Sequence, residues 1–334
     1  MLLTREQLKA CATGWLETRE DNEGIVFFRM PEELHRRYVK RDEVLAGRSL
    51  ASASVVLEFW TDARSLTVEY DGQRAECGPF MPLDFYCDGI LCPVTGFDRE
   101  KNTLTEDCME CCALTANLPE GEHLVSVYLP WNLTARIHTV TLEGETFRPH
   151  RRKLRWLAMG DSITQGVKAE HASMTYVNRL ARKLDAEVLN VGIGGDTFCD
   201  CGVLPYEYPK VDFVTSAYGT NDFNHRKEAE FAHHMPLHMQ HLAEAFPSTP
   251  IFVLLPLWRG LEAKAPVREL ISLQCVRERI AKEAAKYPNM TVIDCRHFLP
   301  HEQEYYGDPY LLHPNDAGFD LYAEKLYEIL KETL

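Results

Sequence analysis

Hydrophobic and polar residues alternate along much of the first 147 residues. SLTVEY (65–70) places three apolar side chains on one face and is followed by an Asp-Gly pair, which is typical of a turn. HLVSVYLP (123–130) repeats the alternation after a Glu-Gly pair, and GIVFFR, ASVVLEFW and RIHTVTLEG are further candidate strands. Short strands with frequent turn signals predict a jelly-roll-like β-sandwich. A short helix with Thr4 as its N-cap is expected before it.

The pattern changes after RPHRRK (148–153), a charged segment that contains a proline. Beyond it, apolar runs alternate with stretches of helical spacing, and the last stretch, near the carboxyl terminus, is the clearest helix. The expected strands are 154–159, 187–191, 211–217, 250–255 and 290–294. Five strands that alternate with helices predict a parallel sheet covered on both faces. We therefore expect a β-sandwich domain at 1–150 and an α/β domain at 151–334.

Polar residues of catalytic type follow the expected strands of the second half. Ser162 comes directly after the first strand, in the sequence GDS, and the second strand runs into NVGIGGDT (190–197). The third strand runs into YGTND, which contains Asn221, and His313 lies just before the last helix. Each residue by itself suits a turn or a helix cap. Together they lie at the edge of a parallel sheet where functional crevices form.

Attack on an ester requires a nucleophile, a base and fixed donors for the oxyanion. Ser162 offers the first and His313 the second. A glycine in GIGGDT allows a backbone N–H to approach a developing oxyanion closely, and Asn221 offers a side-chain amide. The surroundings of Ser162 differ from the nucleophile elbow of α/β-hydrolases, because Thr164 stands where that motif has glycine.

The four blocks GDSIT, GIGGDT, GTND and HPND resemble, in this order, those of the SGNH (GDSL-type) hydrolases. The resemblance covers residues 154–334 and implies a flavodoxin-like three-layer α/β/α fold. It implies Ser162 as nucleophile, His313 as general base, and an oxyanion hole made of the Ser162 N–H, the Gly195 N–H and the Asn221 side chain. The first half, with PLDFYCDG (82–89), is more loosely similar to the amino-terminal sandwich of some members.

The family usually carries an aspartate three residues before the histidine, and here that position is Tyr310. Asp308 lies five residues before His313. Two additional residues could form a bulge that restores the contact, or a backbone carbonyl could orient His313 in a Ser-His dyad. We expect Asp308 to orient His313.

Two further sets of residues have weaker signals. Trp258 and Arg259 follow the fourth strand, and they and Tyr310 are candidate substrate contacts at the same edge of the sheet. His234, His238 and His241 have helical spacing that suits a metal, but Pro236 interrupts it, so a helix face without metal is expected. We expect neither a metal nor an organic cofactor.

Composition narrows the classes of partner. The 334 residues have a formal charge of −14, which disfavours nucleic acid and anionic membranes. No signal peptide or membrane-spanning run stands out, and the eleven cysteines fit reduced thiols, so a cytoplasmic location is expected. The oligomeric state stays open, with a homo-oligomer as one option.

The expected activity is hydrolysis of a carboxylic ester through an acyl-serine intermediate. The resemblance implies a short acyl group as substrate, such as acetyl on a carbohydrate. Two alternatives remain at this point. One is acyl transfer to a second alcohol through the same acyl-enzyme, and the other is a non-catalytic glycan-binding protein in which the displaced aspartate marks a lost triad.

Overall fold

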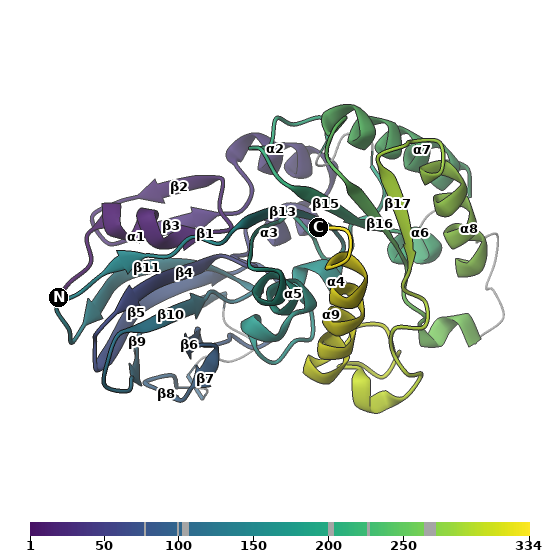
Figure 1. Ribbon diagram of the computed structural model, residues 1–334. Helices are drawn as coiled ribbons and strands as arrows, with labels where there is room; N and C mark the ends of the chain where they lie inside the picture. The colour runs from purple at the N-terminus through teal and green to yellow at the C-terminus, as the bar shows by residue number, and fades with distance from the viewer. Residues whose placement is uncertain (77, 99, 102–106, 200–203, 226–227, 264–271) are drawn as a thin grey trace. The chain divides into compact units, whose positions relative to one another are not determined.

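A computed structural model describes the chain except for residues 77, 99, 102–106, 200–203, 226–227 and 264–271 (Figure 1). The contacts divide the chain into two units. The first contains residues 1–35, 46–153 and 171–173, and the second contains 36–45, 154–170 and 174–334. The main division thus follows Lys153, close to the boundary expected from the sequence, and the placement of 36–45 with the second unit was not foreseen.

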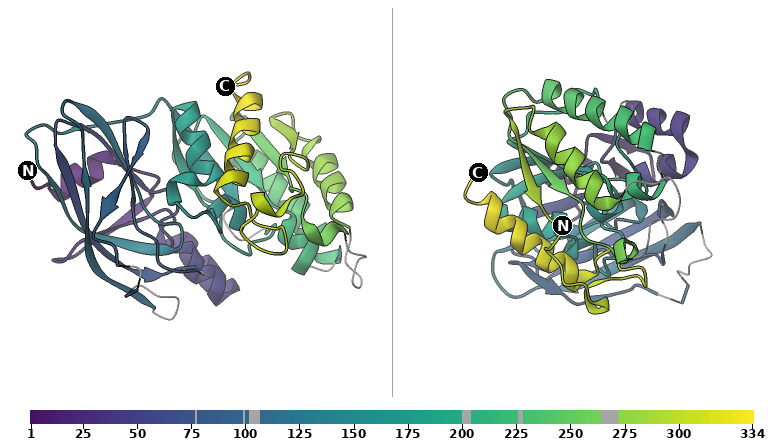
Figure 2. Two further views of the ribbon diagram at one scale, coloured as in Figure 1. Left: turned by 90° about the horizontal axis from the view of Figure 1, so that it is seen from below. Right: turned by 90° about the vertical axis from the view of Figure 1, so that its right-hand side faces the viewer.

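The first unit is built on two antiparallel sheets that share one hydrophobic core (Figure 2). One sheet has the order β1-β4-β10-β6-β7, with β12 paired to β4, and the other has the order β2-β3-β11-β5-β9-β8. Apolar side chains from both sheets, such as Phe59, Val125, Val68 and Leu114, belong to this core. The first sheet comprises β1 (Ala12–Thr13), β4 (Val56–Thr61), β6 (Asp84–Cys87), β7 (Ile90–Cys92), β10 (His123–Tyr128) and β12 (Arg148–Pro149). The second comprises β2 (Glu17–Glu20), β3 (Ile25–Phe28), β5 (Ser65–Arg74), β8 (Val94–Thr95), β9 (Cys108–Asn117) and β11 (Leu133–Leu142).

Three helices precede or interrupt the strands of the first half of the chain. Helix α1 (Arg5–Cys11) begins at Thr4, whose side chain accepts from the Gln7 N–H, so the expected N-cap is confirmed. Helices α2 (Glu32–Arg41) and α3 (Glu43–Ser49) lie where the sequence indicated mainly strands. Their charged sequences do not show the period-two alternation that marked the strands.

The second unit contains a five-stranded parallel sheet of order β14-β13-β15-β16-β17. All five expected strands are present, with ends that differ by up to two residues: β13 (Leu154–Gly160), β14 (Ala186–Asn190), β15 (Phe213–Ala217), β16 (Ile251–Leu255) and β17 (Met290–Asp294). Four of the residues of β13 before Gly160 are fully buried, which explains its continuous apolar run. Strand β14 is added on one side of β13, and β15 to β17 are added on the other, so the strand order reverses at β13. In parallel sheets the functional crevice forms at such a point, at the carboxyl ends of the strands.

Helices cover both faces of this sheet (Figure 2). Helix α5 packs against α9 and against β13 and β14, whereas α8 packs against α6, α7, β16 and β17. The α-helices of this part are α4 (Ser162–Gln165), α5 (Tyr176–Leu184), α6 (Thr220–His225), α7 (Glu228–Ala245), α8 (Leu273–Ala284) and α9 (Asp316–Leu330). Short 3-10 turns lie at Ala172–Met174, Gly260–Ala263 and Gln303–Tyr305. The expected three-layer α/β/α fold is confirmed. None of the helices in the described residues has the length and apolarity needed to cross a bilayer.

Candidate active site

Ser162 is the first residue of α4 and follows strand β13 after a single turn residue. That residue, Asp161, caps the helix, because its Oδ1 accepts from the Ile163 N–H at 3.0 Å. Burial raises the pKa of Asp161 to about 7. Gly160 is required at the end of the strand, since a Cβ there would lie 2.3 Å from Thr164 Oγ1 and 2.8 Å from the Ala217 carbonyl oxygen.

Thr164 stands where the α/β-hydrolase elbow has glycine, and the structure shows why this turn accepts it. Its side chain is fully buried, and its Oγ1 lies 2.9 Å from the Tyr176 hydroxyl. A Cβ on Gly192 would lie 2.7 Å from Thr164 Cβ, so the loop after β14 approaches the Ser162 turn closely. The glycine that makes this close approach possible is therefore Gly192, on the loop after β14, and the nucleophile turn itself carries Thr164.

Ser162 and His313 lie within proton-transfer distance of each other. Ser162 Oγ is 2.9 Å from His313 Nε2, although the two residues are 151 positions apart in the sequence. Ser162 is only 5 % exposed, and the side chain of His313 is 18 % exposed. The geometry therefore allows His313 to take the proton of Ser162 when the hydroxyl attacks a substrate.

Asp308 reaches the other nitrogen of the same imidazole. Its Oδ2 lies 2.8 Å from His313 Nδ1 and also accepts from the His313 backbone N–H at 2.8 Å. Its Oδ1 accepts from the backbone N–H groups of Tyr310 at 2.9 Å and Leu312 at 3.3 Å. Burial acts to raise the pKa of Asp308, but the hydrogen bonds from His313 and Tyr310 outweigh it and lower the pKa to about 2.

The two additional residues between Asp308 and His313 form a closed loop. Leu311 has a φ of 50°, and Gly307 N–H donates to the His313 carbonyl at 2.9 Å, which brings both ends of the loop together. Asp308 is thus displaced along the sequence, but its carboxylate still contacts His313. The reason for considering a lost triad and a non-catalytic protein does not hold in the structure.

The donors expected for an oxyanion follow the carboxyl ends of β13, β14 and β15: Ser162 begins α4, Gly195 lies in the loop after β14, and Asn221 lies in the first turn of α6. Gly195 has a φ of 84°, a conformation that favours glycine, and in the described part of the chain its N–H has no acceptor. Asn221 is 5 % exposed, and its Nδ2 donates to the Asp196 carbonyl at 2.8 Å. One amide hydrogen of Asn221 is therefore held, which leaves the second in a fixed direction.

The expected substrate contacts differ in exposure. The ring of Trp258 stacks on His301, with ring centroids 3.7 Å apart and planes 9° apart. Tyr310 is 64 % exposed, and its loop adjoins that of Trp258 through a hydrogen bond from Gly260 N–H to the Leu311 carbonyl. Arg259 is 2 % exposed, whereas a substrate contact is expected to be exposed. Its guanidinium instead turns inward, where Nη1 donates to the Thr220 carbonyl at 3.1 Å.

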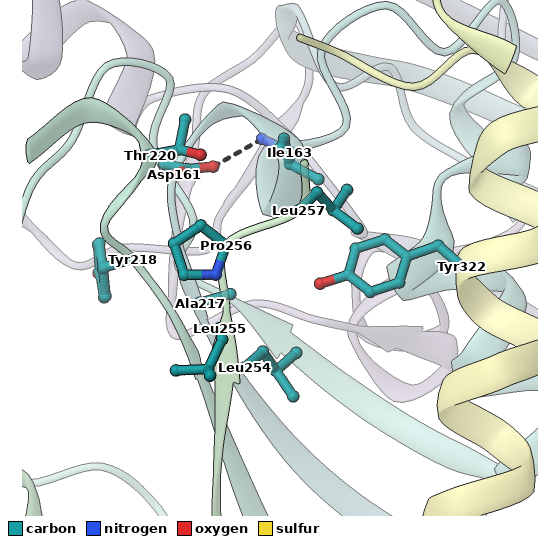
Figure 3. A pocket seen from close by; sticks show the side chains of 10 residues that line it. All are labelled: Asp161, Ile163, Ala217, Tyr218, Thr220, Leu254, Leu255, Pro256, Leu257 and Tyr322. Carbon is teal, nitrogen blue, oxygen red and sulfur yellow. Dashed lines mark hydrogen bonds between the residues drawn. The ribbon is translucent and has the colours of Figure 1, made fainter. Parts of the chain in front are cut away.

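A small pocket lies beside the Ser162 turn (Figure 3). Its walls are mainly apolar and come from the Ser162 turn, the ends of β15 and β16, and α9: Asp161, Ile163, Ala217, Tyr218, Thr220, Leu254, Leu255, Pro256, Leu257 and Tyr322. Figure 3 shows Asp161 and Ile163, the two neighbours of Ser162, joined by the capping hydrogen bond at its edge. Because Ser162 itself does not line this pocket, we do not assign it to the acyl group.

The histidines with helical spacing lie on α7, which runs through Pro236. His238 is 3 % exposed, and its Nδ1 lies 3.3 Å from the Cys199 carbonyl. Burial lowers the pKa of His238 to about 4, so its ring is neutral near pH 7. Within the described residues, the group whose ligand atoms lie close enough for a metal is Cys87, Asp88 and His123, and the α7 histidines are not part of it.

Tyr38 and Arg41 were not found by sequence reasoning. Both lie on α2, and their segment (36–45) belongs to the second unit. The Tyr38 hydroxyl donates to Asp196 Oδ2 at 2.9 Å, and Arg41 Nη1 donates to Asp196 Oδ1 at 2.6 Å. The only signal in the sequence would have been the spacing of the two residues, which places them on one helix face.

Residues 158–321 match the model of the GDSL-like lipase/acylhydrolase family. The chain carries a domain of this family. The matched segment contains all five residues expected at the catalytic centre: Ser162, Gly195, Asn221, Asp308 and His313. A comparison with curated proteins found no match.

Several solved structures share the fold of this protein along most of its length. The chain is 24 % identical to the salicylyl-acyltransferase SsfX3 from a tetracycline biosynthetic pathway, with a TM-score of 0.78 over 96 % of this chain and 94 % of that one. It is 18 % identical to a putative GDSL-like lipase from Bacteroides ovatus, with a TM-score of 0.73 over 99 % and 97 %. A family two carbohydrate esterase from Cellvibrio japonicus is 17 % identical, with a TM-score of 0.63 over 98 % and 96 %.

Proposed function

We propose that this protein hydrolyses a carboxylic ester through an acyl-enzyme on Ser162. His313 takes the proton of Ser162 as the hydroxyl attacks the carbonyl carbon, and it returns the proton to the leaving alcohol. Water then attacks the acyl-enzyme, His313 takes its proton, and Ser162 leaves with that proton. The observation that carries this proposal is the 2.9 Å separation of Ser162 Oγ and His313 Nε2.

Asp308 and the oxyanion donors complete the proposed mechanism. Asp308 holds the imidazole so that Nε2 faces Ser162, and its negative charge stabilises the imidazolium that forms during attack. The N–H groups of Ser162 and Gly195 and the side chain of Asn221 stabilise the oxyanion. Loss of one such donor lowers the rate by about 10²–10³ in comparable enzymes. The residues of this mechanism need no metal or organic cofactor.

The test is turnover of p-nitrophenyl esters of graded acyl length by the parent protein and by Ser162→Ala. We expect hydrolysis that is fastest with the shortest acyl groups and is lost in Ser162→Ala. Ser216→Ala is a matched control, because Ser216 is a buried serine of strand β15, next to β13, and lies outside the proposed mechanism. Equal turnover by the parent and Ser162→Ala would contradict the proposed nucleophile.

We further propose that the ester is an O-acetyl group on a carbohydrate. Support comes from the fold shared with a carbohydrate esterase, and from the aromatic residues Trp258 and Tyr310 on adjoining loops of the catalytic unit. Aromatic faces pack well against the apolar faces of sugar rings. Acetate release from acetylated oligosaccharides is the test, and Tyr310→Ala should raise KM for them while p-nitrophenyl acetate turnover stays unchanged. An equal effect on both substrates would contradict a sugar contact.

Acyl transfer is a second candidate, which the fold shared with a salicylyl-acyltransferase over 96 % of the chain favours. Hydrolysis and transfer share every step up to the acyl-enzyme, and they differ in whether water or an alcohol attacks it. Product analysis with and without sugar acceptors distinguishes them. New acylated sugar, formed at the expense of free acid, would favour transfer, and unchanged release of acid would favour hydrolysis.

A further inference from the structure

Asp196 links the two oxyanion donors that follow β14 and β15, Gly195 and Asn221. The N–H of Gly195 belongs to the residue directly before it, and its carbonyl accepts from Asn221 Nδ2 at 2.8 Å. A displacement of Asp196 would therefore move both donors together. The mechanism above gives Asp196 no role of its own, yet its side chain is only 2 % exposed.

The carboxylate of Asp196 is held by three donors. Tyr38 Oη donates to Oδ2 at 2.9 Å, Arg41 Nη1 donates to Oδ1 at 2.6 Å, and the Thr197 N–H donates to Oδ1 at 2.8 Å. Arg41 Nη2 also donates to Thr197 Oγ1 at 2.8 Å. The planar guanidinium thus binds two consecutive residues of the loop, which fixes the loop's orientation as well as its distance from α2.

Burial makes this contact depend on charge. Tyr38 is fully buried, and the side chain of Arg41 is 19 % exposed. Burial acts to lower the pKa of Arg41, but the Asp196 carboxylate outweighs it and the pKa is raised, so Arg41 stays charged. Burial and the Asp196 charge raise the pKa of Tyr38, so Tyr38 stays a neutral O–H donor. A carboxylate at this depth requires such partners.

We propose that Tyr38 and Arg41 are positioning residues of the oxyanion hole, which hold Asp196 and thereby fix the Gly195 N–H and the Asn221 amide. The role rests on the proposed ester hydrolysis. Oxyanion donors act when they are held about 2.7–3.1 Å from the position of the developing charge. Loosening both donors should therefore slow the chemical step and leave substrate binding almost unchanged.

The experiment compares kcat and KM of Arg41→Ala, Arg41→Lys and Tyr38→Phe with the parent. Lys40→Ala is the matched control, because it removes a positive charge from an exposed position of the same helix. We expect kcat to fall by about 10- to 100-fold in Arg41→Ala with KM within about threefold of the parent. Arg41→Lys should recover part of the loss, since it keeps the charge but not the bidentate contact.

A general loss of folding would also lower kcat, so the design includes a readout that such a loss does not mimic. Asn221→Ala removes one donor, and Arg41→Ala in that background should cost clearly less than in the parent, because both changes act on the same hole. If Arg41→Ala does not fold, Arg41→Lys and Tyr38→Phe carry the test, since Tyr38→Phe removes only the hydroxyl.

Two outcomes would overturn the positioning role alone. In the first, the Arg41 and Tyr38 variants have the same kcat as Lys40→Ala. In the second, Arg41→Ala lowers kcat by the same factor in the Asn221→Ala background as in the parent. In both cases the parent would retain turnover that depends on Ser162. A parent without Ser162-dependent turnover would instead overturn the proposed function, and the positioning role with it.

Discussion

Asp308 is the site residue whose spacing along the sequence departs most from that of the GDSL-type hydrolases. It is displaced by two positions along the chain, but its Oδ2 lies 2.8 Å from His313 Nδ1. Its pKa of about 2 keeps it ionised throughout the neutral range, where it can stabilise the imidazolium. Spacing in the sequence is therefore a poor guide to this contact, because a loop closed at Gly307 absorbs the additional residues.

Asp308→Asn tests this role. The substitution keeps the size of the side chain but removes the charge, and it allows the imidazole to adopt the wrong tautomer. We expect kcat for a p-nitrophenyl ester to fall by about 10²–10⁴, in line with the loss of an orienting acid in other serine hydrolases. Glu302→Gln is the control, because it removes a carboxylate from an exposed position of the same segment. A fall of less than about threefold would favour a Ser-His dyad.

At the scale of elements, the site depends on how closely the β13 turn approaches its neighbours. Gly160 leaves no room for a side chain beside Thr164 and the Ala217 carbonyl. Gly160→Ala should lower the free energy of unfolding by about 1–3 kcal/mol and reduce turnover, because the Ser162 turn must shift. Urea denaturation measures the first effect. Gly47→Ala, in helix α3 with nothing within 4 Å of its Cβ, should leave stability unchanged or higher, and similar losses in both variants would contradict the argument.

The cap of α4 predicts a dependence of stability on pH. Burial raises the pKa of Asp161 to about 7, whereas an unfolded aspartate titrates near about 3.9. The folded state therefore holds a proton that the unfolded state has lost, and this contribution to stability is fully present below about pH 4 and is lost as the pH rises through about 7. Asp161→Asn keeps an acceptor for the Ile163 N–H but cannot ionise.

The stability of Asp161→Asn relative to the parent should accordingly rise between about pH 5 and about pH 8. Urea midpoints of both proteins at the two pH values measure this difference. Asp185→Asn, at the carboxyl end of α5 in the same unit, serves as a control for removal of a carboxylate. A difference between Asp161→Asn and the parent that is the same at both pH values would contradict a raised pKa.

At the scale of the whole molecule, the sequence predicts the fold better than the contacts of the site. Long apolar runs separated by helical stretches identified all five parallel strands, because burial on both faces leaves a strong signal. The four polar blocks identified Ser162 and His313, because Ser162 directly follows a recognisable strand and His313 directly precedes a recognisable helix. Helix α2 gave no such signal, and its pairing with Asp196 joins residues 155 positions apart.

The burial of Arg259 could not be predicted from the sequence either. A charged residue after a strand suggests an exposed contact, but whether a guanidinium turns toward solvent or toward a carbonyl such as that of Thr220 depends on tertiary packing. The sequence thus predicts which loops form the site. Which side chains of those loops are exposed, and which support them from behind, emerges only in three dimensions.

The most direct test of the account is covalent labelling of the folded protein by a fluorophosphonate, with the modified residue located by mass spectrometry. The proposed mechanism predicts stoichiometric modification at Ser162, slower modification in His313→Ala, and none in Ser162→Ala. Absence of labelling in folded protein, or labelling that persists in Ser162→Ala, would contradict the claim that Ser162 is an activated nucleophile.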